Sequence, residues 1–263
     1  MSAIFPITFE RHATQRWLRP TDHSFTGQDA TALLTLHELA QAALHLPIAF
    51  VAHEEGFLPV AVLGLVPGKN LFVGLDGRWL GGYVPAVYGA YPFVLAPAAA
   101  GQVALCINEA SGLLSSTAGE PFFTDGGVPN PAVAGVLGFL NQQATHQQQA
   151  VGVCTLLKQH QLIEPWPIKL QGGAQTQNVE GLHRISEAAL NGLPAQALLT
   201  LRNAGALALA YCQLLSMQHL QTLGKLADAH AQVAAAAQAA TVPTQSKELD
   251  LSFLEGSQTL KFF

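Results

Sequence analysis

The segment from Asn70 to Pro97 constrains the fold more than any other part of the chain. It contains five glycines, three prolines and six aromatic residues, and its only charged side chains are Asp76 and Arg78. Glycine permits backbone angles that other residues avoid, and proline fixes φ and removes a hydrogen-bond donor. Aromatic side chains at this density need a core, a pocket or a partner to cover them. The segment therefore predicts a tightly specified unit of turns and packed rings.

The chain carries few charged residues. Asp, Glu, Lys and Arg make up 11% of its 263 residues, compared with roughly 25% in an average soluble domain. Because charged side chains are seldom buried, this deficit falls on the surface, which then repels its neighbours poorly. A homo-oligomer or a standing protein partner is therefore as reasonable an expectation as a neutral monomer. The net charge is −5 and the Lys and Arg residues are scattered, so we expect no nucleic-acid partner.

The cysteines and the N-terminus bear on the compartment. Cys106, Cys154 and Cys212 lie far apart, each within an apolar run, which is typical of buried thiols in a reducing compartment. The first residues lack a basic head followed by a long apolar core, and no window of about 18 uninterrupted apolar residues occurs. We therefore expect no transmembrane segment and a cytoplasmic location by default. Delivery to the cell surface by a route that reads no N-terminal signal is the alternative.

Hydrophobic periodicity predicts a strand-rich first half. Residues 30–46 place apolar side chains at helical spacing and are followed by Pro47, so we expect a helix there. The apolar runs 48–52 and 58–66 are joined by the sequence HEEGF, which is typical of a hairpin with Gly56 in its turn. Further strands are expected at 4–9, 70–73, 93–96 and 102–108, and a short helix at 84–88.

The period changes after residue 130. We expect helices at 131–144, 151–161, 194–202 and 206–240, a short helix capped by Ser186, and strands at 168–171 and 178–185. These elements predict an α+β fold, with a mainly antiparallel sheet in the N-terminal half packed against a helical C-terminal half. We expect one domain over 1–240, strand-rich over 1–130 and helix-rich over 131–240. A flexible linker and a strand-like C-terminal tail then occupy 241–263.

Motifs for common chemistry do not occur in the sequence. The segment GLVPGKN (64–70) lacks the spacing and the Ser or Thr of a phosphate loop, and there is no Gly-x-Ser-x-Gly elbow. His53, Glu55 and His183 have the ligand types of a facial iron site. However, His53 and Glu55 fall in the expected hairpin turn, where solvated side chains are usual. We therefore assign no catalytic residue, no metal site and no cofactor.

Polar and aromatic side chains within otherwise apolar segments give the candidate ligand pocket. A charge in such a segment is usually paired, and we expect Arg78 to pair with Asp76 or Glu109. The rings either line a pocket or pack a junction between sheet and helix. The residues of the candidate pocket are Asp76, Arg78, Trp79, Tyr83, Tyr88, Tyr91, Glu109 and Asp125.

In these same segments the sequence resembles the bacterial SapC family. The blocks VLGLVPGKNLFVGLDGRWLGGYVPAVYGAYPFVL, CINEASGLL, GEPFF, LIEPWP, GLHRISEAALNGLP and LLSMQHLQTLGKL occur in the family's order, and LDLSFLEGSQTLKFF resembles the family's ending. Two positions depart from the family pattern. Gly89 and Ala90 stand where many relatives carry a basic pair, and Asn108 replaces an Asp before Glu109. If those charges bind something in relatives, that function is altered here.

The resemblance implies a modest functional picture. The family name suggests association with the paracrystalline surface layer. Many relatives are encoded beside outer-membrane receptors and flavin-dependent halogenase-like enzymes, which would suit an accessory role in the uptake or modification of a small substrate. The family provides no established catalytic residue to carry over.

Three functional hypotheses follow. The first is a non-enzymatic binding or assembly protein of the SapC type at the surface layer, with its tail adding to a sheet edge. The second is an enzyme or accessory protein that binds a small molecule in a cleft lined by Arg78, Trp79 and Tyr83, with Glu109 or Asp125 nearby. The third is an iron-dependent oxygenase that uses the two histidines and Glu55.

Overall fold

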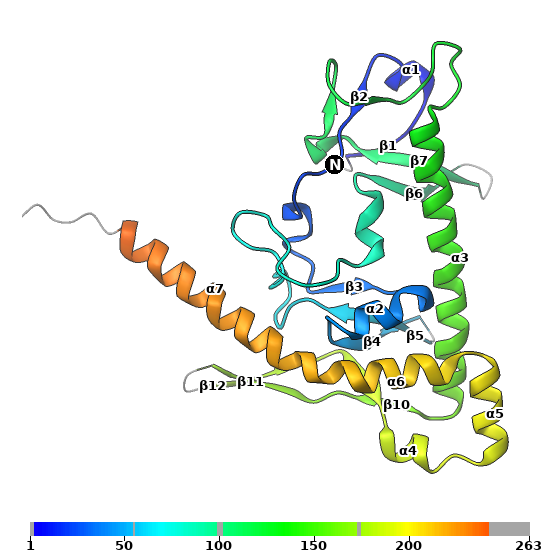
Figure 1. The fold of residues 1–263 in the computed structure, drawn as a ribbon, viewed down its shortest axis with the longest axis vertical. Helices are drawn as coiled ribbons and strands as arrows, with labels where there is room; N and C mark the ends of the chain where they lie inside the picture. The colour runs from blue at the N-terminus through cyan, green and yellow to red at the C-terminus, as the bar shows by residue number, and fades with distance from the viewer. Residues whose placement is uncertain (1–2, 55, 99–101, 173–174, 242–263) are drawn as a thin grey trace, which may run out of the picture. The chain divides into compact units, whose positions relative to one another are not determined.

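The computed structural model in Figure 1 describes residues 3–54, 56–98, 102–172 and 175–241, and only the backbone within 169–178 and 237–241. The chain forms two compact units, Met1–Ala227 and Asp228–Phe263. The described part of the second unit is the C-terminal portion of helix α7 (Leu220–Thr241). The predicted tail and the linker beyond Thr241 lie outside the described residues.

The first unit has the predicted α+β fold, and each strand pair in its described part is antiparallel. The largest sheet has the order β10-β13-β4-β5-β3, and two three-stranded sheets have the orders β1-β7-β6 and β8-β2-β9. The five strands of the largest sheet are β3 (Thr31–Leu33), β4 (Ile48–His53), β5 (Gly56–Val62), β10 (Ile163–Pro165) and β13 (Leu182–Ile185). The smaller sheets comprise β1 (Ile4–Pro6), β6 (Phe93–Pro97), β7 (Val103–Asn108), β2 (Arg16–Trp17), β8 (Leu114–Ser115) and β9 (Glu120–Pro121). A separate hairpin pairs β11 (Ile168–Gly172) with β12 (Gln175–Val179).

The predicted hairpin between β4 and β5 is confirmed. Its register pairs Ile48 with Ala61 and His53 with Gly56. The left-handed position of the turn is Glu54, with φ of 47°, whereas Gly56 begins β5. The hairpin does not form the sheet alone, because β13 adds to β4 and β10 adds to β13. The large sheet therefore draws strands from both halves of the chain.

The helix expected at 30–46 is wrong over its first part. The chain forms β3, then a 3-10 helix η2 (Leu36–Glu38), and only then α2 (Leu39–Ala43). Thr35 has an extended backbone and precedes the first helical turn. Its backbone N–H donates a hydrogen bond to the Glu38 carboxylate. This reciprocal arrangement between a Thr and the Glu three residues later marks a helix start. The helical turn thus begins only after Thr35, and residues 31–33 before it pair with β5 as a strand.

The two helices expected at 131–144 and 151–161 are one continuous helix, α3 (Pro131–Gln159). The Asn130 side chain accepts from the N–H of Ala132 at the start, and Pro131 occupies the first turn. The intervening glutamines contain no helix breaker, so the helix continues through them. α3 contacts β6, η2 and β5. Figure 1 shows it running alongside the five-stranded sheet and the sheet β1-β7-β6.

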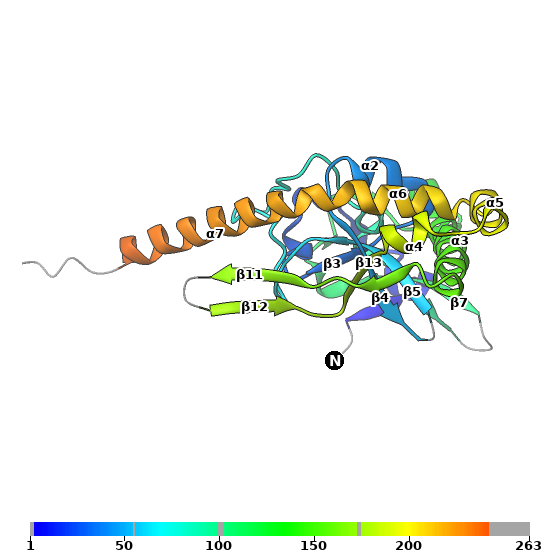
Figure 2. The same cartoon turned by 90° about the horizontal axis from the view of Figure 1, so that it is seen from below.

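Shorter helices complete the first unit. The predicted helix at 206–240 is interrupted by a 3-10 turn, η6 (Met217–His219), between α6 (Ala206–Ser216) and α7. Figure 2 shows α6 lying across the large sheet, where it contacts β4 and β13. The remaining short helices are α1 (Phe9–His12), η1 (Ser24–Thr26), η3 (Ala86–Ala90), η5 (Glu109–Ser111), α4 (Glu187–Asn191) and α5 (Ala195–Asn203).

The described core has two clusters of buried apolar side chains. The larger lies between the five-stranded sheet, α2, α3 and α6, and includes Phe50, Leu157 and Leu209. The smaller contains Trp17, Phe93, Ile107, Phe122 and Val133, and lies between the two three-stranded sheets and the start of α3. Burial of these side chains is the main stabilising contribution to the unit.

Within the described ranges, no single helix combines the length and hydropathy needed to cross a membrane. One pair passes when taken together, Ala195–Asn203 with Ala206–Ala236, but it is bent by 91° at the break.

Candidate functional site

The glycine-rich aromatic segment folds as a series of turns fixed to the core, and the strand expected at 70–73 does not form. Before β6, the only ladder contact of this segment in the described residues is a single bridge between Val73 and Trp79. The buried Asn70 side chain donates to the carbonyl of Thr26 at 3.1 Å and accepts from the N–H of Phe72 at 2.9 Å. These bonds hold the entry to the segment in place.

Gly77 shows why this segment needs glycine. Its φ is 78°, and a Cβ there would lie 2.3 Å from the hydroxyl of Ser24. A side chain would therefore be strained and would also clash with the neighbouring loop. The turn thus depends on glycine both for its backbone angle and for its close approach to residues 22–24.

Glu38 ties the aromatic segment to the large sheet. Its carboxylate is buried and accepts four hydrogen bonds. One oxygen accepts from Thr35 N (2.8 Å) and Thr35 Oγ1 (2.9 Å), and the other accepts from Tyr83 Oη (2.8 Å) and Ala86 N (2.8 Å). Burial, with a smaller effect of Glu38, raises the pKa of Tyr83 above its ordinary range. Tyr83 is therefore a neutral donor in a structural contact.

Tyr88 makes an analogous contact from the next turn. Its hydroxyl donates to Asp29 Oδ2 at 3.0 Å. Burial and the Asp29 carboxylate raise the pKa of Tyr88 well above its ordinary range. The two tyrosine bonds position η3, and with it one wall of the cavity described next.

Beside η3 lies a cavity of about 420 Å³, which we call the aromatic cleft. Its walls come from β2, the loop after it, η1, η3, the start of β6 and α3. The rings of Phe25 and Tyr91 stack at 3.9 Å between centroids and 7° between planes. The lining residues are Trp17, Arg19, Pro20, Thr21, Asp22, His23, Phe25, Val84, Pro85, Ala86, Tyr88, Gly89, Ala90, Tyr91, Phe93, Val136 and Phe139.

Opposite charges at the cleft are engaged in local contacts. Arg19 pairs with Glu120 at 3.1 Å, and its guanidinium lies 5.1 Å from the ring centroid of Trp17. The Asp22 carboxylate accepts from the N–H of Ser24 at 2.8 Å, and this bond lowers the pKa of Asp22. One cation and one anion therefore face the cleft. Such a lining suits a flat, largely apolar molecule better than a strongly charged one.

The structure brings only part of the predicted pocket together. Tyr88 and Tyr91 line the aromatic cleft. Trp79 packs on Phe72 with ring centroids 5.6 Å apart, and its indole N–H donates to the carbonyl of Tyr83 at 2.8 Å. Trp79 and Tyr83 therefore support the cleft from the core side without lining it.

The charged residues of the predicted pocket lie elsewhere. Asp76 and Arg78 occupy an exposed turn, where an Asp76 oxygen accepts from the N–H of Arg78 at 3.1 Å. Asp125 lines a separate hollow of about 480 Å³ beside Gln15. In the described part of the chain, the expected ion pair between Arg78 and Glu109 does not form, because Arg11 takes that carboxylate.

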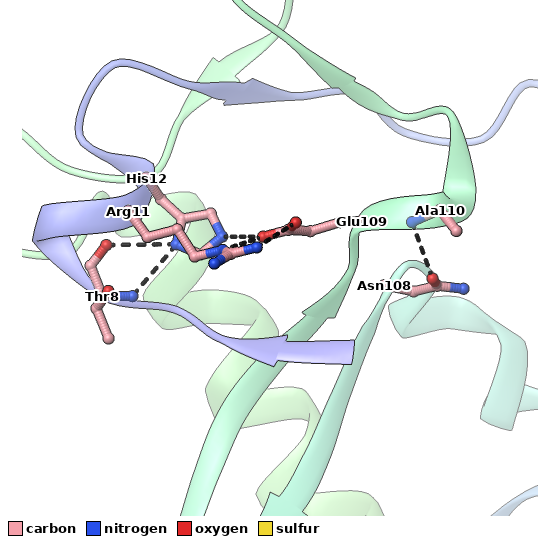
Figure 3. Close-up of polar contacts among 6 residues, drawn as sticks. All are labelled: Thr8, Arg11, His12, Asn108, Glu109 and Ala110. Atoms are coloured by element: carbon pink, nitrogen blue, oxygen red, sulfur yellow. Dashed lines mark hydrogen bonds and ion pairs between the residues drawn. The ribbon is translucent and has the colours of Figure 1, made fainter. Parts of the chain in front are cut away.

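Figure 3 shows the cluster around Glu109. Arg11 donates to both carboxylate oxygens, with Nη2–Oε2 at 2.7 Å. The buried His12 ring has Nε2 3.4 Å from Glu109 Oε1 and Nδ1 3.3 Å from the carbonyl of Thr8. These contacts fix α1 to the end of β7, so the cluster has a structural role.

This cluster predicts loss of stability in acid. Burial lowers the pKa of His12 below its ordinary 6.5, and hydrogen bonds from Arg11 lower the pKa of Glu109 below 4.5. Both groups bind fewer protons in the folded state than in the unfolded state. Their contribution to the free energy of unfolding is therefore present above these ordinary pKa values and is lost as the pH falls.

We expect His12→Phe, which keeps a ring against Phe122, to reduce the fall in unfolding free energy between about pH 7.5 and about pH 5. Urea unfolding at both pH values measures this, and an undiminished fall, equal to that of the exposed control His53→Phe, would contradict it.

The metal hypothesis finds no support in the described residues. Glu55 lies outside them, and no group of three or more His, Cys, Asp or Glu side chains within them has the arrangement of a metal site. The three cysteines are free, and burial raises the pKa of Cys154 to about 12.

Sequence reasoning missed several residues that shape the cleft. The Thr35-x-x-Glu38 spacing is a capping-box signal and could have identified the buried glutamate. Trp17, Arg19 and Phe25 carry no such local signal, because they come together with η3 around the cleft only in the folded chain.

Comparison with known proteins identifies a family for this chain. The family model of SapC matches residues 7–223. No curated protein and no solved structure matches the chain. Because the match covers most of the chain, including the five-stranded sheet, the aromatic cleft and α6, the chain belongs to the SapC family.

Proposed function

We propose that this protein is a non-enzymatic binding protein that holds a small planar molecule in the aromatic cleft. The observation that carries the proposal is the cavity of about 420 Å³ beside the stacked rings of Phe25 and Tyr91. Small-molecule sites are typically cavities of this size, lined by apolar and aromatic side chains with a few polar groups. Aromatic rings accept flat ligands by offset or edge-to-face contacts.

The polar groups around the cleft support binding rather than catalysis. Tyr88 donates to Asp29, Asp22 accepts from Ser24 N, and Arg19 pairs with Glu120. Each contact holds a wall of the cleft and leaves its polar group committed to the fold. A rigid site of this kind suits a carrier or accessory protein that presents a small substrate to another protein, the role that the family resemblance suggested.

A glycine in η3 offers a direct test. Gly89 lines the cleft, and a Cβ there would lie 3.3 Å from the end of the Phe139 ring. A larger side chain would therefore extend into the cavity while the backbone keeps an ordinary φ. We expect Gly89→Leu to weaken binding of 2-ethylnaphthalene by about tenfold or more, measured by ligand-observed NMR. The control is Gly152→Leu on an exposed part of α3, where a Cβ meets no atom within 4 Å.

Two results would contradict the proposal. Failure of the wild-type protein to bind both 2-ethylnaphthalene and the ketone of similar shape, 2-acetylnaphthalene, would remove the cleft as a site for planar molecules. Equal binding by the wild-type, Gly89→Leu and Gly152→Leu proteins would place the probe elsewhere.

A second candidate function, self-association, is favoured by an exposed apolar surface. Between α4 and α6 lies a groove of about 730 Å³, here named the α4–α6 groove. Leu215 and Tyr211 line it and are 68% and 50% exposed. Exposed apolar patches often mark protein interfaces, and the weakly charged surface opposes association little. We propose that a second copy of the chain covers this groove.

We expect Leu215→Glu to lower the solution mass of the protein, because it places a charge in the proposed interface. Light scattering coupled to size-exclusion chromatography measures the mass. The control is Leu75→Glu, at a leucine outside the groove that is also largely exposed (79%). A wild-type monomer, or an oligomer that both variants retain, would contradict self-association through this groove.

A further inference from the structure

We propose that the ligand of the aromatic cleft is an aromatic amine, a flat apolar molecule that carries one positive charge and places it near the carboxylate of Asp22. The inference rests on the proposed binding function and specifies the chemistry of its ligand.

Asp22 lies at the rim of the cleft, because it is a lining residue that is also exposed to solvent. A ligand can therefore approach its carboxylate without any movement of the protein. One carboxylate oxygen accepts from the N–H of Ser24 at 2.8 Å, and this bonding lowers the pKa of Asp22, so the group is negatively charged near neutral pH. A carboxylate has about four acceptor sites, so its contact with Ser24 leaves the charge and further acceptor capacity for a ligand.

The charges around the rim do not neutralise Asp22. Arg19, the cation that lines the cleft, is already balanced by Glu120 at 3.1 Å. The turn that approaches Asp22 carries one charge of each sign, Asp76 and Arg78. Among the described residues Asp22 forms no ion pair of its own. A net negative charge therefore remains at the rim, and it favours a cationic ligand over an anionic one.

The aromatic lining favours the same charge. The face of an aromatic ring attracts a cation that lies within about 6 Å of its centroid. The guanidinium of Arg19 lies 5.1 Å from the ring centroid of Trp17, so a ring of this cleft already contacts one positive charge. An aromatic amine can pack its own ring in the cleft and place its ammonium group near Asp22, whereas a carboxylic acid of the same shape is repelled by both. The Phe, Tyr and Trp residues of the lining are Trp17, Phe25, Tyr88, Tyr91, Phe93 and Phe139.

Three molecules of similar shape test the charge of the ligand: 2-naphthylmethylamine, 2-ethylnaphthalene and 2-naphthoate. At about pH 7.5 the first is a cation, the second is neutral and the third is an anion. We expect the wild-type protein to bind the amine about three- to tenfold more tightly than the hydrocarbon, and 2-naphthoate less tightly than either, measured by ligand-observed NMR. Raising the salt concentration from about 0.02 M to about 0.5 M should reduce the preference for the amine, because salt screens exposed charges.

Asp22→Asn tests the carboxylate directly, because it removes the charge and keeps a side-chain oxygen that can accept from Ser24 N. We expect it to weaken binding of the amine about threefold and to leave binding of the hydrocarbon within about 1.5-fold. The matched control is Asp125→Asn, which removes the same charge from an exposed residue at the separate hollow. Gly89→Leu should weaken binding of both molecules, because it reduces the cavity that they share.

Each outcome separates this inference from the proposed function. Preference for the amine that is lost in Asp22→Asn and kept in Asp125→Asn supports both. Equal affinity for amine and hydrocarbon, a preference that Asp22→Asn retains, or tighter binding of 2-naphthoate than of the hydrocarbon overturns the cationic ligand and leaves the cleft as a site for planar molecules. If none of the naphthalene probes binds, the proposed function fails and this inference fails with it.

Discussion

Glu38→Ala is expected to lower the free energy of unfolding by about 3–5 kcal/mol. The substitution removes the acceptor of four hydrogen bonds, two buried bonds from Thr35 and two partly buried bonds from Tyr83 and Ala86. Burying an unsatisfied donor costs about 1–3 kcal/mol, and four donor groups on three residues lose their acceptor. Urea unfolding followed by circular dichroism measures the change. The matched control is Glu10→Ala, an exposed glutamate in α1, for which we expect a change within about 0.5 kcal/mol.

The amide variant tests whether the carboxylate itself matters. Glu38→Gln keeps the shape and one acceptor oxygen, but its NH₂ group faces two donors. We expect a loss smaller than that of Glu38→Ala and still above about 1 kcal/mol. A Glu38→Ala protein as stable as the Glu10→Ala control would show that this carboxylate does not hold the aromatic segment to the sheet.

Gln213→Leu is expected to lower the free energy of unfolding by about 2–4 kcal/mol. Gln213 is fully buried on α6, and its amide joins two strands of the large sheet. Its Oε1 accepts from Ile185 N at 2.9 Å on β13, and its Nε2 donates to the carbonyl of Ile48 at 3.2 Å on β4. The amide thus connects the two strands beyond the last paired residues, His183 and Phe50. Leucine fills a similar volume and leaves both backbone groups without a partner.

The control for this prediction is Gln218→Leu, at an exposed glutamine in the 3-10 turn that follows α6. We expect it to change the unfolding free energy by less than about 0.5 kcal/mol. The hydroxyl of Ser216 accepts from Ile48 N at 2.9 Å, so Ser216→Ala should cause an intermediate loss of about 1 kcal/mol. Equal stability of the Gln213→Leu and Gln218→Leu proteins would exclude this role for the amide.

Local sequence patterns were enough to predict the elements whose determinants lie within one segment. The β4–β5 hairpin follows from two apolar runs and a short polar turn, and β6 and β7 follow from paired apolar runs in the same way. The start of α3 follows from Pro131 in its first turn. The failures occurred where a local pattern had two interpretations. Residues 31–33 have helical spacing, yet strand pairing with β5 and the start of the helical turn at Thr35 decide their structure.

The candidate site was less predictable, because its parts meet only in the folded chain. The aromatic segment was correctly identified as a packing unit, and Tyr88 and Tyr91 do line the cleft. Nothing near Glu109 in the sequence indicates that Arg11, 98 residues earlier, takes its carboxylate. In the same way, Trp17 reaches the cleft through β2 and its contact with Phe93. The type of side chain alone could not show that the charged residues of the predicted pocket lie away from the cleft that Tyr88 and Tyr91 line.

Mapping of probe contacts by NMR tests the central claim, that the aromatic cleft is the binding site, most directly. Methyl-labelled wild-type protein is titrated with 2-acetylnaphthalene, and shifts are read at Val84, Ala86 and Val136, which line the cleft. The account predicts the largest shifts at these methyl groups, and their reduction in the Gly89→Leu protein. Shifts concentrated at Leu190 and Leu214, which line the α4–α6 groove, or no shift at any of these methyl groups, would contradict it.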